Sequence, residues 1–193
     1  MLEKTKEFWP NKQVSYGKLK NPFKPFDYEP QFSGDYGLYF GRIIDEKGVD
    51  RIVDAARNID VPIKIIGDGP DLSKLKSIIS DEDIRNIEFL GPMWGSELTA
   101  VLQQAKFVIV PSLWHENFPY VIFQAFASGK PVIGSKRGGI PELIQSDKGI
   151  LFEPDNIHEL EAAILKLWGD SALCESMGRN ARCLLYTSDA ADE

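Results

Sequence analysis

Short apolar runs alternate with amphipathic stretches from residue 36 to residue 167. In the amphipathic stretches apolar residues recur every three or four positions, as in Val49, Ile52, Val53 and Ala56, which predicts helices with one buried face. Because each parallel crossover needs a return of helix length, this alternation predicts a parallel sheet. The runs expected to form its strands are 36–40, 63–66, 87–90, 107–110, 131–133 and 149–152. We therefore expect an α/β fold with a doubly wound, Rossmann-like parallel sheet.

The expected helices follow residues that suit a helix N-terminus. Asp45, Ser96 and Asn156 each precede an amphipathic stretch and offer a side-chain oxygen to the free amides of the first turn. The stretches expected to be helical lie within 49–56, 72–79, 98–105, 121–127 and 157–167. In open parallel sheets ligands bind at the carboxyl ends of the strands, where helix N-termini point outward. That edge is where we look for function.

The chain divides into three parts by pattern. Residues 1–34 are rich in proline and aromatic residues without a helical period, so we expect an irregular arm or linker. Residues 35–185 carry the alternating pattern and form the expected domain. The end of the chain, LLYTSDAADE from Leu184, has no apolar period, and we expect 186–193 to be a non-native or disordered tail.

Composition narrows the class of protein. With 43% hydrophobic and 26% charged residues the chain is typical of a folded domain, and a formal charge of -7 argues against a nucleic-acid partner. The cysteines, Cys174 and Cys183, lack metal-ligand spacing and suit a reducing compartment. The charged start does not resemble a secretory signal, and no apolar run is long enough for a transmembrane segment. We expect a cytoplasmic protein.

Two cations follow the first expected strand, in the motif GRIIDEKG. Arg42 at the strand end and Lys47 near the next helix suit a diphosphate, although a pair of solvated surface charges explains them equally well. After the second strand comes IGDGP, in which a tight turn is favoured over a ligand contact. It is not a dinucleotide fingerprint, because Leu72 stands where the third glycine is required, and this disfavours an NAD-dependent oxidoreductase.

The segment after the fourth expected strand, PSLWHENFPYVIFQAFASGKPVI, is the most informative. It places the carboxylate of Glu116 in a loop and Pro119 at the start of a helix, where the missing N–H costs little. The amides of Tyr120 and Val121 are then available to an anion. Gln124 interrupts an apolar run, so its amide needs a partner, either a ligand hydroxyl or a backbone group.

These motifs, with NIEFLG and GGIPELI, occur in an order and spacing that resemble the C-terminal, donor-binding domain of family 4 (group 1) glycosyltransferases over 36–185. The resemblance implies one half of a GT-B architecture and a retaining, metal-independent hexosyl transfer from a UDP-, GDP- or ADP-linked sugar. No cofactor is implied, since the nucleotide sugar is itself the donor substrate. The implied acceptor is a glycan or lipid of cell-surface polysaccharide biosynthesis, bound by a second domain, so the full-length enzyme could be membrane-peripheral.

The resemblance also assigns roles to residues. Arg42 and Lys47 neutralise the leaving diphosphate, and Glu116 faces the donor sugar, so these form the implied catalytic set. Leu90 lies near the base. The implied substrate-binding set is Gly41, Leu90, Phe118, Tyr120, Val121, Gln124, Gly138 and Gly139.

The sequence departs from the family pattern in three ways. Gln124 replaces the second acid of the Glu, seven residues, Glu motif, which normally contacts the ribose hydroxyls, and Pro119 replaces the usual glycine. A whole enzyme of this family is also much longer than 193 residues and includes an acceptor-binding domain. We therefore expect a fragment that is inactive on its own. A non-catalytic nucleotide-binding domain is the alternative, although Arg42, Lys47 and Glu116 are all present.

Overall fold

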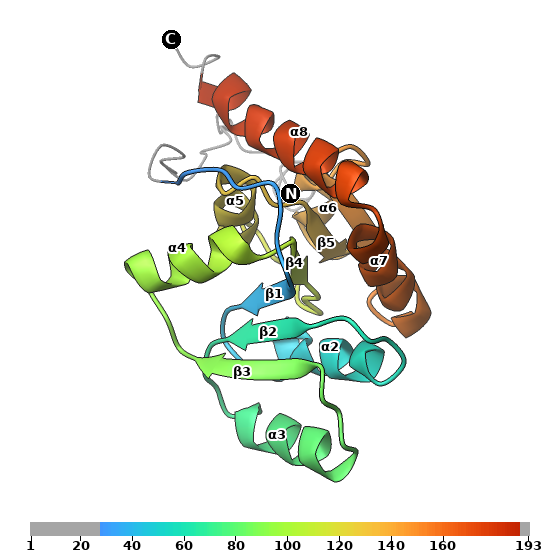
Figure 1. Ribbon diagram of the computed structural model, residues 1–193. Coiled ribbons are helices and arrows are strands. Elements are labelled where there is room, and N and C mark those ends of the chain that lie inside the picture. The colour runs from blue at the N-terminus through green and yellow to red at the C-terminus, as the bar shows by residue number, and fades with distance from the viewer. Residues whose placement is uncertain (1–27, 190–193) are drawn as a thin grey trace, which may run out of the picture.

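The computed structural model describes residues 28–189, and in that part of the chain the sheet has six strands with every neighbouring pair parallel. The strand order is β3-β2-β1-β4-β5-β6, and Figure 1 shows this order from β3 to β5. The strands are β1 (Gly37–Phe40), β2 (Ile63–Ile66), β3 (Ile87–Gly91), β4 (Phe107–Val110), β5 (Val132–Ser135) and β6 (Gly149–Phe152). This confirms the expected doubly wound, Rossmann-like α/β fold, with the fifth strand starting and ending slightly later than predicted.

Helices cover both faces of the sheet. They are η2 (Asp45–Lys47), α2 (Val49–Ala56), α3 (Leu72–Asp81), α4 (Gly95–Gln104), α5 (Tyr120–Ala127), α6 (Ile140–Leu143), α7 (Ile157–Gly169) and α8 (Ser171–Asp189). Along β1, Tyr39 joins a core with α2, α3 and α7, whereas Leu38 and Phe40 join a second core with α4, α5 and α6. Successive residues of a strand point to opposite faces of the sheet, and helices cover both faces. β1 and β4 are therefore buried throughout, which explains their continuous apolar sequence.

Two of the three predicted helix caps are wrong. Asp45 lies inside the short helix η2, and α2 begins after Gly48, whose left-handed conformation (φ 65°) turns the chain. Ser96 lies within α4, which begins after Trp94. Asn156 is confirmed, because its side chain accepts a hydrogen bond from the amide of Glu159. In the first two cases the backbone turn, set by a glycine, decides where the helix starts.

The helix α8 was not predicted, although a signal for it exists. Cys174, Met177, Ala181 and Leu185 are all buried and follow one another at spacings of three or four residues, as one face of a helix requires. Small and weakly apolar side chains make this stripe less visible than those of leucine and isoleucine. The helix runs to Asp189 and so includes the first residues of the expected tail, while residues 190–193 lie outside the described residues.

The described part of the expected arm, residues 28–34, is irregular but held against the domain. The amide of Gln31 donates to the carbonyl of Ser128 (3.0 Å), and Lys130 Nζ donates to the carbonyls of Ser33 (3.0 Å) and Gln103 (2.7 Å). Lys130 is fully buried, and burial lowers its pKa to about 8. The rest of the expected arm, residues 1–27, lies outside the described residues.

Candidate functional site

The order of the strands creates a crevice between β1 and β4. The chain leaves β1 toward β2 on one side, and it leaves β4 toward β5 on the other. The loops that follow these two neighbouring strands therefore diverge, and such a switch point is where open parallel sheets bind ligands. The loop after β1 carries Arg42 and Lys47, and the loop after β4 carries Glu116, so the topology brings the predicted catalytic set to one edge.

The two loops are joined through their backbones. The carbonyl of Glu46 accepts hydrogen bonds from the amides of Leu113 (2.9 Å) and Trp114 (3.1 Å). At Gly48 a Cβ atom would lie 2.2 Å from the carbonyl oxygen of Pro111, so no other residue fits between the loops without displacing them. The loops thus hold each other at a fixed separation.

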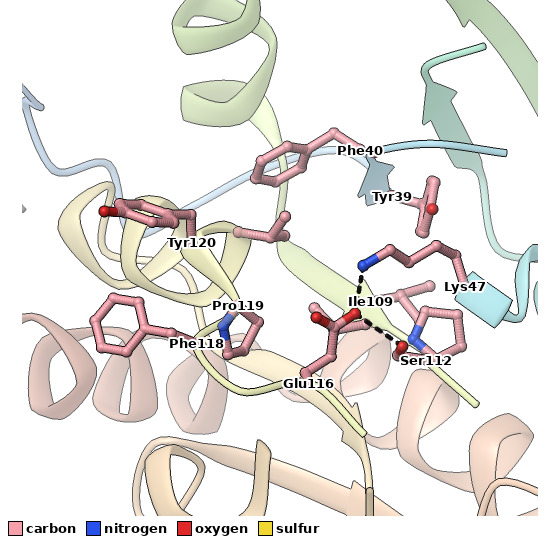
Figure 2. Close-up of a pocket in the computed structure, with 13 residues that line it drawn as sticks. Tyr39, Phe40, Lys47, Ile109, Ser112, Glu116, Phe118, Pro119 and Tyr120 are labelled. Atoms are coloured by element: carbon pink, nitrogen blue, oxygen red, sulfur yellow. Dashed lines mark hydrogen bonds and ion pairs between the residues drawn. The ribbon is translucent and has the colours of Figure 1, made fainter. Parts of the chain in front are cut away.

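The side chains of Lys47 and Glu116 meet across this junction (Figure 2). Lys47 Nζ donates to Glu116 Oε1, and Ser112 Oγ donates to the same oxygen at 2.9 Å. The Lys47 side chain is 27% exposed and that of Glu116 is 15% exposed, so the ion pair is partly shielded from water. Ser112 is itself buried, and its carbonyl accepts a hydrogen bond from Ser135 Oγ (2.6 Å). The carboxylate is therefore fixed in position by two donors.

A cavity of about 210 Å³ opens beside this pair; we call it the ion-pair cavity. Lys47, Ser112 and Glu116 line one side, and Phe118 and Tyr120 line the other (Figure 2). The rest of its wall is formed by Tyr39, Phe40, Gly41, Ile109, Val110, Pro111, Pro119 and Val121. Its wall is mainly apolar but holds one cation and one carboxylate, next to the N-terminus of α5.

Tyr39 was not predicted as a site residue but lines this cavity. Its hydroxyl donates to the carbonyl of Arg42 (2.6 Å), which fixes the start of the loop after β1. Burial raises the pKa of Tyr39 well above its usual value, and the nearby charge of Glu116 raises it further. The tyrosine therefore stays a neutral donor.

A second cavity of about 460 Å³ lies next along the sheet edge, toward β2; we call it the arginine cavity. It shares Phe40, Gly41 and Val121 with the ion-pair cavity. The remaining lining residues are Arg42, Ile66, Gly67, Asp68, Pro92, Met93, Trp94, Leu98 and Gln124. Arg42 is exposed, and within residues 28–189 its guanidinium makes no hydrogen bond or ion pair. The cation is thus available to a ligand.

Gln124 finds a partner that the sequence did not suggest. Its Nε2 donates to the hydroxyl of Tyr28 at 3.0 Å, rather than to a backbone group. Gln124 also lines the arginine cavity, so one side chain links the segment 28–34 to the site.

Glycines of the motifs IGDGP and GGIPELI lie against the backbones of the loops that carry Arg42 and Glu116. In IGDGP, a Cβ atom at Gly67 would lie 1.8 Å from the carbonyl oxygen of Gly41, so the turn is pressed against the loop that carries Arg42. A Cβ atom at Gly138 would likewise clash with the backbone of Glu116, and the amide of Gly139 donates to the Glu116 carbonyl at 2.7 Å. These glycines position the loops of the site.

The remaining members of the predicted substrate-binding set differ in position. Phe118 stacks on Phe123 with ring centroids 4.3 Å apart and meets Tyr120 edge to face. Leu90 is partly buried against the core and lines neither cavity. Sequence reasoning missed Ser112, and the Pro-Ser pair directly after a buried strand was the available signal.

Residues 28–189 were searched for clusters of metal-ligating side chains and for helices that could span a membrane. This part of the chain contains no group of three or more His, Cys, Asp or Glu side chains placed to hold a metal ion. None of its helices is long and apolar enough to span a bilayer.

Comparison with known proteins adds a family and three relatives. The family model for glycosyl transferases group 1 matches residues 26–183. The uncharacterized glycosyltransferase MJ1178 of Methanocaldococcus jannaschii is 34% identical over 152 residues, covering 77% of this chain and 43% of MJ1178. The crystallised C-terminal domain of the group 1 family protein LpcC from Francisella tularensis is 28% identical, with a TM-score of 0.69 over 80% of this chain and 86% of that one.

A third relative was solved with a ligand. Anabaena Alr3699/HepE in complex with UDP-glucose is 25% identical, with a TM-score of 0.72 over 78% of this chain and 43% of HepE. The chain therefore spans less than half the length of MJ1178 and of HepE, and most of the length of the LpcC domain.

Proposed function

The chain belongs to the glycosyl transferase group 1 family, and from that membership we propose that its domain binds a nucleotide diphosphate sugar in the β1–β4 crevice and holds it for transfer. The Rossmann-like sheet corresponds to one half of a GT-B enzyme. The observation that carries the proposal is the meeting of Lys47 and Glu116, which are 69 residues apart in sequence, beside the available guanidinium of Arg42.

The charges of the site suggest how the donor lies. A diphosphate carries negative charge that needs local compensation in a protein of net charge -7. Lys47 lines one cavity, Arg42 lines the other, and Gly41 lines both. Val121, in the first turn of α5, also lines both cavities, and a helix N-terminus favours an anion. We therefore place the diphosphate at Gly41. HepE, solved with UDP-glucose, supports a nucleotide sugar as the ligand class.

The sugar then occupies the ion-pair cavity, where it faces Glu116. In the transfer, the bond between the anomeric carbon and the diphosphate oxygen breaks, and the electron pair leaves with the diphosphate. A hydroxyl oxygen of the acceptor bonds to the anomeric carbon on the same face, and its proton passes to the departing diphosphate. Arg42 and Lys47 stabilise the charge that develops on the leaving group, in place of a metal ion. Glu116, held by Ser112, orients the sugar through its hydroxyls.

The acceptor supplies the nucleophile of the proposed transfer. We propose a glycan or lipid hydroxyl, bound by residues of a second domain across the cleft, and we expect this chain alone to transfer no sugar. The cytoplasmic location and the hexosyl nature of the donor remain predictions. Gln124 in place of the second motif acid favours one alternative, a nucleotide-binding domain without transferase activity.

Calorimetry on the full chain tests the proposal. UDP, GDP and ADP are titrated with and without EDTA, and NAD serves as the non-cognate nucleotide. We expect at least one nucleoside diphosphate to bind, with unchanged affinity in EDTA. Arg42→Ala should lower the affinity about tenfold to a hundredfold, because it removes charge-assisted contacts.

Arg85→Ala is the matched control. Arg85 is an exposed arginine that pairs with Asp83 and lines neither cavity, so its loss changes net charge equally. Equal losses in the two variants would reduce the role of Arg42 to long-range charge. Binding that EDTA abolishes would contradict a metal-independent site, and absence of binding by every nucleoside diphosphate would contradict the function itself. Hydrolysis of a bound donor would separate the transferase from the non-catalytic alternative.

A further inference from the structure

Trp94 occupies an unusual position at the rim of the arginine cavity. Its side chain is 74% exposed, more than those of the other large hydrophobic residues that are exposed in the described part of the chain. It also lines the arginine cavity, together with Arg42 and Met93. Large apolar side chains left in water beside a cavity often mark a binding surface.

The fold gains little from a tryptophan at this position. Trp94 is the N-cap residue of α4, yet it makes no side-chain capping hydrogen bond, which a serine or aspartate would supply. Within residues 28–189 its indole N–H has no hydrogen-bond partner. Replacing Trp94 should therefore leave the stability of the domain almost unchanged.

The loop that carries Trp94 has a defined shape. Gly91 and Gly95 bracket Pro92, Met93 and Trp94, and both glycines have left-handed backbones (φ 78° and 55°). No atom lies within 4 Å of a Cβ built at either glycine, so glycine is needed here for its backbone conformation and not for close packing. The chain thus makes two sharp turns within five residues and presents Trp94 between them.

The two cavities differ in size and in the polar side chains that they offer, and we use this difference to assign the ends of the ligand. The ion-pair cavity, with Lys47 and Glu116, suits the hydroxyls of a sugar. The arginine cavity is larger and lined mainly by apolar side chains, which suit the flat faces of a base. A diphosphate at Gly41, where the cavities meet, directs the nucleoside into the arginine cavity.

We propose that Trp94 is the platform on which the base of the nucleoside diphosphate stacks. This inference rests on the proposed function, since it assigns the residue that contacts one part of the same ligand. Stacking on an indole involves the π-face of a base and not its hydrogen-bonding edge. Trp94 should therefore contribute to the affinity for every base without selecting among them. Trp94 then supplies affinity, and the selection of one base falls to other groups.

Two substitutions separate stacking from simple apolar contact. Trp94→Phe keeps an aromatic face, whereas Trp94→Leu keeps apolar bulk without one. Trp114→Leu is the control, because Trp114 is also exposed (59%) but lines neither cavity. The affinities of the full chain for UDP, GDP and ADP are measured by calorimetry, with circular dichroism to check the fold. These probes carry no transferable sugar, so a lost contact must involve the nucleoside or the diphosphate.

We expect Trp94→Leu to weaken binding of each nucleotide that the wild type binds by roughly tenfold to a hundredfold. The nucleotide affinity of Trp94→Phe should stay within about threefold of that of the wild type, and the affinity of Trp114→Leu should equal that of the wild type. Wild-type affinity in Trp94→Leu would overturn the inference and leave the proposed function intact. Equal losses in the Phe and Leu variants would also overturn it, because an aromatic face would then not be the required feature. If the wild type binds no nucleoside diphosphate, the proposed function fails first and the inference fails with it.

Discussion

Lys47 is paired with Glu116, whereas Arg42, in the same motif, has no partner among residues 28–189. We therefore expect substitutions of these two cations to change the stability of the domain by different amounts. Substituting Lys47 with Met leaves a carboxylate that is only 15% exposed with Ser112 Oγ as its remaining donor. Exposed ion pairs are worth about 0–1 kcal/mol, and breaking a buried pair costs about 3–5 kcal/mol. Because the Lys47 side chain is 27% exposed, we discount the buried value strongly and expect a loss of about 1–2 kcal/mol. Arg42→Ala, at an exposed side chain, should change stability by less than about 0.5 kcal/mol.

A double-mutant cycle measured by urea unfolding isolates the pair. The free energies of unfolding of Lys47→Met, Glu116→Gln and the double variant should give a coupling energy of about 1 kcal/mol. In a domain of this size Lys47→Met should lower the Tm by about 2–8 °C, since 1 kcal/mol corresponds to about 2–4 °C. A coupling energy near zero, or an equal loss in Arg42→Ala, would refute the reasoning.

The same pair predicts an opposite effect on ligand binding. A diphosphate that contacts Lys47 competes with Glu116 for the ammonium group. Removing that competitor and its negative charge with Glu116→Gln should therefore raise the affinity for a nucleoside diphosphate by several-fold, while Lys47→Met lowers it. Calorimetry on both variants gives the result, and a loss of affinity in Glu116→Gln would show that the carboxylate itself helps to hold the diphosphate.

Three further predictions follow from other parts of the structure. Gly48→Ala should lower the free energy of unfolding in urea by more than about 2 kcal/mol, because it combines a positive φ with a Cβ 2.2 Å from a carbonyl oxygen. Gly91→Ala also has a positive φ but places its Cβ in open space, so it should cost about 1 kcal/mol. Equal costs would contradict the close approach at Gly48. Because the pKa of Lys130 is lowered to about 8, the unfolded chain holds a proton that the folded chain has released between pH 8 and the ordinary lysine pKa of 10.5. The stability of the wild type relative to Lys130→Met should therefore rise across that range by up to about 3 kcal/mol, and a flat difference would contradict the burial. Gln124→Leu should remove a preference for ribonucleotides over 2′-deoxyribonucleotides, and an unchanged ratio would restrict Gln124 to its bond with Tyr28.

The fold followed from the sequence because its determinants are local. Each strand is a short apolar run, and the helices α2, α3, α4 and α5 repeat their apolar residues within one or two turns, so the period is visible without tertiary information. The short helices η2 and α6 are too brief to show such a period and were not predicted. Helix starts were less predictable. At α2 the chain turns at a glycine in the left-handed region, and a nearby aspartate that has the right chemistry for a cap lies in a separate short helix. Side-chain chemistry indicates which residues can cap a helix, but the path of the backbone decides which residue does.

The contents of the site were predicted better than its contacts. Lys47 and Glu116 line the ion-pair cavity and Gln124 lines the arginine cavity, but the sequence alone could not identify the partners of these residues. Lys47 and Glu116 are separated by 69 residues, and Gln124 and Tyr28 by 96. Such pairs depend on strand order and loop geometry, which a single sequence expresses only through motifs. The argument that Gln124 needs a partner was correct, but the partner in the structure is the hydroxyl of Tyr28, whereas the sequence suggested a ligand hydroxyl or a backbone group.

The ion pair also links binding to the chemistry of the proposed transfer. While Glu116 is bound to Lys47, part of its charge is neutralised, and it interacts only weakly with a sugar hydroxyl or a developing positive charge on the anomeric carbon. A diphosphate that takes over Lys47 releases the carboxylate, and Ser112 still holds it in place. The negative charge then faces the sugar only when a diphosphate is bound beside it. On this argument the leaving group of the proposed transfer itself prepares Glu116, and we expect Lys47 to take part in both proposed steps: binding of the diphosphate and release of the carboxylate.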